Sequence, residues 1–158
     1  KTQLAFKQLS LPLEVYPVVS NVSMLALLLQ AGCKTLQLRL KQDINCCDKG
    51  IGFENEQQKT LWIEQQVANA IELGRKYNAQ LFINDHWQLA LKYVAFGVHL
   101  GQEDALSADL AVLAQNNMAL GLSSHSYFEI LLATQVNPSY IALGHIFATT
   151  TKNTLFSY

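Results

Sequence analysis

The sequence has little of what marks secreted, membrane or nucleic-acid-binding proteins. Among 158 residues there are only three cysteines, Cys33, Cys46 and Cys47, and their odd number and the absence of a CxxC pair argue against a disulfide framework. No run of about 18 apolar residues occurs, and Lys1–Pro12 lacks a continuous apolar core, so we expect neither a membrane span nor a signal peptide. Charged residues make up 15% and the net charge is −1, which disfavours binding to nucleic acid. We therefore expect a cytoplasmic protein.

What the sequence does have is apolar residues in a regular arrangement. Half of the residues are hydrophobic, enough for a single domain over residues 1–158 with a sizeable core. Short apolar segments alternate with segments of helical periodicity, which is typical of βαβ units in a parallel sheet. The predicted strands are Glu14–Val19, Thr35–Lys41, Gln80–Ile83, Gly97–Leu100, Ala119–Leu122 and Tyr140–Leu143. The predicted helices are Val22–Ala31, Thr60–Tyr77, Trp87–Tyr93, Ser107–Gln115 (with Ser107 as N-cap) and Tyr127–Gln135.

The spacing of these strands favours one α/β architecture over another. Apart from the interval that holds the irregular segment 41–59, the strands recur about every 20 residues. Such short and even spacing fits a TIM (β/α) barrel better than a doubly wound sheet. Six strands are counted where a complete barrel has eight, so we expect an incomplete barrel that lacks the last two βα units.

The second predicted strand carries an unusual polar face. Its leucines alternate with Gln37, Arg39 and Lys41, so the amide and the two cations share one side of the strand. A water-facing strand gives the same pattern. In a parallel α/β protein, however, a solvated face is scarce, and two cations without an acid need an anion. The donors of Arg and Lys suit phosphate oxygens best.

Polar residues also follow the other predicted strands at their carboxyl ends, where the active sites of parallel barrels lie. Arg39, Lys41 and Lys152 supply cations for phosphate, and Ser123, Thr149 and Thr151 supply hydroxyl donors. The carboxylates of Asp85 and Asp104 suit Mg²⁺ that keeps waters and shares phosphate oxygens, although taken singly each is as readily a helix cap. Asn84 suits a phosphate or another part of the ligand. His99 is either a buried hydrogen-bonded residue or a pocket wall.

These segments resemble thiamine-phosphate synthase, also called thiamine-phosphate pyrophosphorylase. The resemblance is carried, in the family's order, by Leu36–Lys41, Leu81–Asp85, Gly97–Asp104, Gly121–His125 and Ala142–Lys152. It implies a transferase on a TIM barrel that joins 4-amino-5-hydroxymethyl-2-methylpyrimidine diphosphate to 4-methyl-5-(2-phosphoethyl)thiazole. Pyrophosphate would leave first, and the thiazole nitrogen would then attack the pyrimidine methylene cation.

The resemblance also implies roles for individual residues. Gln37, Arg39, Lys41 and Asn84 would contact the pyrimidine diphosphate, and His99 joins them as a substrate-binding candidate. The metal ligands for Mg²⁺ would be Asp85 and Asp104. Ser123 and Lys152 would contact the pyrophosphate, while Thr149 and Thr151 would contact the thiazole phosphate. The partners implied are these two small molecules, without nucleic acid or membrane.

Two departures from the family pattern leave alternatives open. Segment 42–59 is longer than the family's usual link and would lie on the active-site side of the barrel. Asn153–Tyr158 stands where the family continues with further strands and Gly-rich loops. The expected function is therefore an active synthase, completed if necessary by association into a homo-oligomer. The alternative is a chain that keeps only Mg²⁺-pyrophosphate binding, and a thiazole-tautomerase-like relative is a third option.

Overall fold

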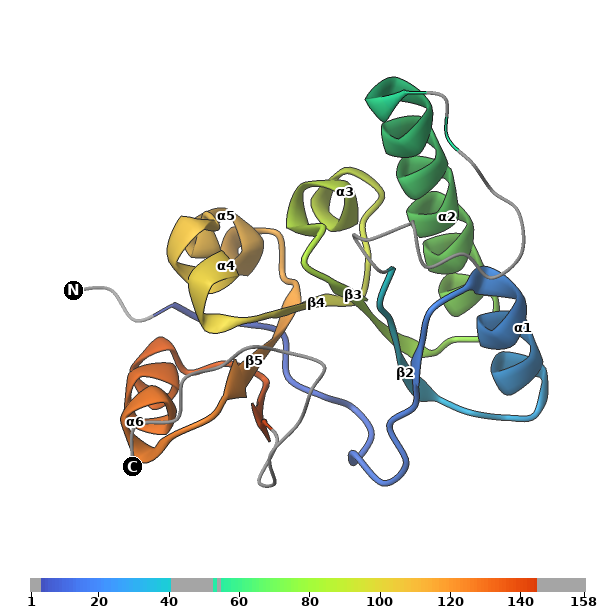
Figure 1. Cartoon of the computed structure of the whole chain (residues 1–158). Helices are drawn as coiled ribbons and strands as arrows, with labels where there is room; N and C mark the ends of the chain where they lie inside the picture. The colour runs from blue at the N-terminus through green and yellow to red at the C-terminus, as the bar shows by residue number, and fades with distance from the viewer. Residues whose placement is uncertain (1–3, 41–52, 54, 145–158) are drawn as a thin grey trace.

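The computed structural model describes residues 4–40, 53 and 55–144, and shows a curved sheet of parallel strands with helices on its outer side (Figure 1). The strands are β1 (Val18–Val19), β2 (Thr35–Leu38), β3 (Gln80–Asn84), β4 (Gly97–Leu100), β5 (Ala119–Ser124) and β6 (Tyr140–Leu143). The helices are α1 (Val22–Gln30), α2 (Glu56–Lys76), α3 (Trp87–Lys92), α4 (Gln102–Ser107), α5 (Leu110–Gln115) and α6 (Tyr127–Val136). The six strands lie side by side in chain order, with at least one helix between successive strands. The predicted α/β fold, a TIM-like barrel of six strands in this part of the chain, is confirmed.

The main core lies between the outer face of the sheet and the helices. The register aligns Leu36 with Leu81 and Val98 with Leu120, and all four side chains are buried. Apolar side chains from α1, α2, α5 and other helices pack against them in one continuous cluster. Full burial of such a side chain stabilises the fold by roughly 1.5–3 kcal/mol, so this face carries much of the stability.

The inner face of the sheet is built from polar and aromatic residues. Of the six buried polar residues in the described part of the chain, five lie on this face: Thr35, Gln37, Gln80, Asn84 and His99. The rings of Tyr16, Phe82, Phe96 and Tyr140 pack beside them, with centroid separations of 5.1–5.9 Å. The alternation predicted for the second strand is confirmed, because Leu36, Leu38 and Leu40 are buried on the face opposite Gln37.

The segment before β1 runs across the amino ends of the strands. The backbone N–H of Lys7 donates to the Met118 carbonyl, just before β5, and Ser139 donates its hydroxyl to the Lys7 carbonyl. Further along, the Gln80 side chain at the start of β3 accepts from the Ser10 amide at 2.9 Å and donates to the Leu11 carbonyl at 3.3 Å. This segment therefore covers the end of the sheet opposite to the predicted active site.

Two predicted boundaries near the amino end of the chain were wrong. The first strand is only Val18–Val19, because Pro17 has no N–H to continue the ladder, although its carbonyl still accepts from Gln37. The long helix begins at Glu56 rather than Thr60, since Asn55 acts as N-cap by accepting from the Gln58 amide at 2.9 Å.

The region after β4 was also predicted incorrectly. The residues Gln102–Ser107 form α4, where a loop was expected, and Ser107 ends this helix instead of capping the next one. The N-cap of α5 is Asp109, whose side chain accepts from the Val112 amide at 3.0 Å. A helix of six residues with two acids in its first turn has too weak an apolar periodicity to be found in the sequence.

Four of the helices are followed by a Gly or Asn residue in the left-handed region. Gly32 follows α1 with φ +95°, and the Cys33 amide donates back to the Leu28 carbonyl, which is the Schellman pattern. Asn78 ends α2 in the same left-handed region, as do Asn117 after α5 and Asn137 after α6. Val94, between α3 and β4, is the exception, because its branched side chain is strained at φ +56°.

The two edges of the sheet expose apolar side chains. In the described residues β1 pairs only with β2, and β6 only with β5. Val18 on β1 is 53% exposed and Leu143 on β6 is 65% exposed, whereas the strands between them are almost fully buried. Helix α6 also exposes the apolar side chains of Phe128 and Leu131. None of the described helices combines the length and hydropathy needed to cross a membrane.

Candidate active site

The described site candidates meet at the carboxyl ends of the strands. Arg39 follows β2, Asn84 ends β3, and Asp85 stands between β3 and α3. His99 on β4 is aligned with Asn84, and Ser123 lies near the end of β5. Asp104 lies in the first turn of α4. The remaining candidates, Lys41, Thr149, Thr151 and Lys152, lie outside the described residues.

The two predicted metal ligands are neighbours. Burial raises the pKa of the Asp85 carboxyl above its ordinary value of 3.8, the charge of Asp104 raises it further, and Arg39 acts in the opposite direction. For His86, burial lowers the pKa, and the same two carboxylates oppose that shift. Asp85, Asp104 and Arg39 therefore lie close enough to sense one another's charge.

The backbone around the acidic pair does not use either carboxylate as a helix cap. Asp85 has φ +63°, and its amide donates to the His99 carbonyl, which ties the turn after β3 to β4. The N-cap residues of α3 and α4 are His86 and Gly101, and neither makes a side-chain cap hydrogen bond. The conformation at Asp85 is one that Asp tolerates better than most residues.

The donor set fits a hard divalent cation. The charge of Asp104 beside the Asp85 carboxylate is unfavourable until a cation binds between them, and Mg²⁺ accepts such oxygens while keeping waters and phosphate oxygens as its other ligands. Within residues 4–40, 53 and 55–144, no group of three or more His, Cys, Asp or Glu side chains gathers. The acidic pair thus suits a metal that shares its ligands with a phosphorylated substrate.

A chain of hydrogen bonds runs across the inner face beside this acidic pair. Gln37 donates through Nε2 to the Tyr16 hydroxyl at 3.1 Å, and the hydroxyls of Tyr16 and Tyr140 lie 2.5 Å apart. The Tyr140 hydroxyl lies 2.7 Å from His99 Nδ1, and His99 Nε2 lies 2.8 Å from Ser123 Oγ. The side chains of three predicted site residues, Gln37, His99 and Ser123, are thereby connected through two tyrosines.

These tyrosines were not among the residues predicted from the sequence. Burial raises the pKa of Tyr16 to about 12 and also raises that of Tyr140, so both hydroxyls keep their protons over the physiological range. The Tyr140 ring lies against Gly121, where a Cβ would overlap it, and is stacked on His99 with centroids 5.6 Å apart. Gln102, just after β4, donates to the Ser123 carbonyl at 2.7 Å. The signal available in the sequence was Gly121, because a glycine inside a buried strand can mark a place where another group packs close to the backbone.

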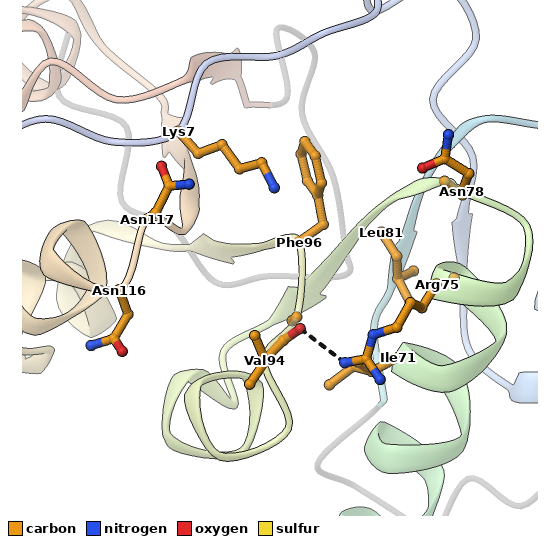
Figure 2. A pocket seen from close by; sticks show the side chains of 12 residues that line it. Lys7, Ile71, Arg75, Asn78, Leu81, Val94, Phe96, Asn116 and Asn117 are labelled. Atoms are coloured by element: carbon orange, nitrogen blue, oxygen red, sulfur yellow. Dashed lines mark hydrogen bonds between the residues drawn. The ribbon is translucent and has the colours of Figure 1, made fainter.

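The chain also has a cavity far from these residues, at the amino ends of the strands. It has a volume of about 310 Å³ and lies between the end of α2, the turn before β4 and the turn before β5 (Figure 2). Arg75 on its wall donates to the Tyr93 carbonyl at 3.0 Å, and Lys7 lies over the Phe96 ring at 4.4 Å. Both cations are thus already engaged by the protein, and none of the candidate site residues lines this cavity.

Comparison with known proteins decides the family. The family model described as thiamine monophosphate synthase matches residues 16–157. The chain belongs to this family. A thiamine-phosphate synthase from Enterobacter sp. (strain 638) is 50% identical over 140 residues, which cover 89% of this chain and 59% of that relative. A thiamine-phosphate synthase from Proteus mirabilis (strain HI4320) is 48% identical over 149 residues, or 94% of this chain and 62% of the relative.

Solved structures show the same fold. The thiamine phosphate pyrophosphorylase from Pyrococcus furiosus superposes with a TM-score of 0.62 at 24% identity, over 85% of this chain and 61% of that one. A phospho-2-dehydro-3-deoxyheptonate aldolase from Thermotoga maritima superposes with a TM-score of 0.53 at 18% identity. The predicted thiamine-phosphate synthase family is therefore confirmed, and the chain spans about three fifths of the length of the curated relatives it matches.

Proposed function

We propose that this chain acts as a thiamine-phosphate synthase, a transferase that joins a pyrimidine diphosphate to a thiazole phosphate. The substrates would be 4-amino-5-hydroxymethyl-2-methylpyrimidine diphosphate and 4-methyl-5-(2-phosphoethyl)thiazole, and the products thiamine phosphate and pyrophosphate. The observation that carries this proposal is the group of acidic, basic and hydroxyl side chains at the carboxyl ends of β2 to β5, in a chain that belongs to this family.

For this reaction the site must stabilise a leaving anion. The bond between the pyrimidine methylene carbon and the diphosphate oxygen breaks, and its electron pair stays on the departing pyrophosphate. The thiazole nitrogen then forms a new bond to the methylene cation. No protein nucleophile is needed, because donors and charges that are already in place lower the energy of the developing anion.

Individual side chains suit parts of this task. Arg39 brings a permanent cation close to the acidic pair, and Ser123 offers a hydroxyl donor at the same end of the sheet. Gln37 and Asn84 are buried amides on the inner face, and they would contact the pyrimidine diphosphate. For Lys41, Lys152, Thr149 and Thr151, the proposal rests on the sequence resemblance alone, the lysines serving the diphosphate and the threonines the thiazole phosphate.

Asp85 and Asp104 would hold Mg²⁺. Their carboxylates are the hard oxygen ligands that this ion prefers, and a cation between them would offset the charge of Asp104, which adds to the effect of burial in raising the pKa of Asp85. When bound, the ion would supply positive charge to the diphosphate oxygens. The protein's own contribution is to keep these two carboxylates together, through the tight turn at Asp85 and the short helix α4.

The proposal is tested by incubating the chain with both substrates and Mg²⁺ and measuring thiamine phosphate by mass spectrometry. Formation of product supports the proposal, and analytical ultracentrifugation in the same buffer then tells whether one chain or a homo-oligomer is active. Isothermal titration with pyrophosphate and Mg²⁺ is run in parallel. Binding without product would overturn the synthase activity while keeping the diphosphate site, and loss of both would contradict the whole assignment.

A further inference from the structure

The hydrogen bonds of the inner-face chain can be donated in two opposite directions. Neutral histidine carries one N–H and one acceptor nitrogen, so His99 either donates from Nε2 to Ser123 or accepts there. The two tyrosine hydroxyls can likewise pass their protons toward His99 or away from it. Because each group has a limited number of donors, the choice at one bond fixes the others.

In one order, each proton points toward Ser123. Gln37 donates to Tyr16, Tyr16 to Tyr140, and Tyr140 to His99 Nδ1, after which His99 Nε2–H donates to Ser123 Oγ. Each donor then has its acceptor, and the Ser123 hydroxyl keeps its own proton for an acceptor outside the chain. A diphosphate oxygen is such an acceptor.

The opposite order of donation leaves a poorly matched group at each end of the hydrogen-bond chain. Ser123 would donate its proton to His99 Nε2. Its hydroxyl oxygen would then face an anion with no proton left to donate. Tyr16 would accept from both Gln37 and Tyr140, and the hydrogen bonds of this inner-face chain then include no acceptor for its own proton. Leaving such a donor unsatisfied costs about 1–3 kcal/mol in a buried position.

We propose that Tyr16 and Tyr140 are positioning residues that hold His99 in its Nε2–H tautomer, so that the Ser123 hydroxyl is directed to donate to the diphosphate. This inference rests on the proposed function for the diphosphate, but the tautomer of His99 does not depend on it. The tyrosines act without contacting the reacting atoms themselves. Their raised pKa values fit this role, because a tyrosine that keeps its proton remains a donor.

The burial of the chain explains why its order persists. His99 is 7% exposed and Gln37 is 4% exposed, so water competes little for their hydrogen bonds. The Tyr140 ring is held between Gly121 and the His99 ring, and it meets the Tyr16 ring edge-on with centroids 5.5 Å apart. Rings packed on two sides keep their hydroxyls in place.

The test has one readout that is independent of function and one that depends on it. In ¹⁵N-histidine NMR of the whole chain, His99 is expected to show a protonated Nε2 and an acceptor Nδ1. Tyr140→Phe removes the donor to Nδ1 and is expected to shift His99 toward a mixture of tautomers. The same variant is expected to weaken pyrophosphate binding in Mg²⁺ about tenfold, because one hydrogen bond to a charged group is worth roughly that factor.

Matched variants separate positioning from contact. Ser123→Ala is expected to lose about the same affinity while leaving the His99 tautomer unchanged. Combining it with Tyr140→Phe is expected to cost no more than Ser123→Ala alone, since both act on one bond. Tyr16→Phe is expected to have a smaller effect, of about threefold, because it lies one bond further away. Tyr127→Phe, at an 87% exposed position on α6, is the control and is expected to change nothing.

Three outcomes would overturn the inference. A protonated Nδ1 on His99 in the wild-type chain contradicts the proposed proton order. A Tyr140→Phe variant with unchanged tautomer and unchanged pyrophosphate affinity contradicts the positioning role. Losses in the double variant that simply add up contradict action through Ser123. If the wild-type chain binds no pyrophosphate, the proposed function fails, and the NMR result alone then decides the order of protons.

Discussion

The two ends of the parallel strands differ in what their polar groups do. At the amino ends, polar groups satisfy one another: Gln80 is 2% exposed and bonds to Ser10, Leu11 and Thr35. At the carboxyl ends, the carboxylates of Asp85 and Asp104 oppose one another. The first arrangement lowers the free energy of the folded chain, whereas two like charges held together raise it. The difference fits a division in which the amino end stabilises the fold and the carboxyl end holds the proposed binding site.

The largest expected effect tests the amino end alone. Phe6 is 4% exposed and belongs to the main hydrophobic cluster. Phe6→Ala is expected to reduce the free energy of unfolding by about 3 kcal/mol, because a buried aromatic ring is lost and a cavity remains. Urea denaturation measures this change. Leu61→Ala, at a 66% exposed position, is the control. If the ends are independent, the affinity of the folded variant for pyrophosphate stays within about twofold of wild type.

A second substitution is expected to change both the stability of the fold and the binding of pyrophosphate. At Gly121, midway along the inner face, a Cβ would overlap the Tyr140 ring. Gly121→Ala is expected to lower the free energy of unfolding by about 2 kcal/mol through overpacking. It is also expected to weaken pyrophosphate binding, because Tyr140 moves away from His99. Calorimetry of folding and of binding measures both changes. Full affinity in a destabilised variant would show that the tyrosine chain does not reach the site.

A substitution in the turn before β4, at the amino end of the sheet, is expected to stabilise the fold. Val94 has φ +56° and is 70% exposed, so its side chain contributes strain and little packing. Val94→Asn is expected to raise the free energy of unfolding by about 1 kcal/mol, since Asn tolerates the left-handed region. Thermal unfolding measures the gain, and Val112→Asn, on α5 in a right-handed helix, serves as the control that gains nothing. An unchanged melting temperature for Val94→Asn would mean that the turn is not strained.

The smallest expected effect on stability comes from the carboxyl end. The pKa of Asp85 is raised in the folded chain, so wild type loses stability as the pH rises from 3.8 to that higher pKa, and the loss then stays constant. Asp85→Asn removes this cost and is expected to be more stable at pH 7 by less than about 1 kcal/mol, since solvent screens the partly exposed group.

The same variant also has a ligand-dependent signature. Millimolar Mg²⁺ with pyrophosphate is expected to raise the melting temperature of wild type and to leave that of Asp85→Asn unchanged. Glu103→Gln, on the exposed side of α4, is the matched control, and its melting temperature is expected to rise as in wild type. A ligand-induced rise of equal size in Asp85→Asn would remove Asp85 from the metal site.

Much of the fold was predictable because it depends on local alternation. Leu36, Leu38 and Leu40 mark a buried face, and the even spacing of such segments implies parallel order. The position of Asp85 and Asp104 after strand ends was enough to place them at one rim. Their closeness follows from the topology, since neighbouring parallel strands bring their ends together.

The missed features depend on contacts between distant segments. Tyr16 and Tyr140 are 124 positions apart, and their hydroxyls meet only because the register places both rings on the inner face. Neither residue stands at a carboxyl strand end, the position shared by the predicted site residues. The segment before β1 has no periodicity, so nothing in the sequence indicated that Lys7 and Ser10 bond across the sheet.

That segment has a consequence for the order in which the chain folds. Each strand pairs with the strand next in sequence, so the sheet grows through short loop closures. The contacts of the segment before β1 span far more of the chain, with Ser10 and Gln80 70 positions apart and Lys7 and Ser139 132 positions apart. Long loops cost more entropy to close, so these bonds form late in folding. The segment that holds Lys7 and Ser10 is therefore expected to be among the last to reach its native place.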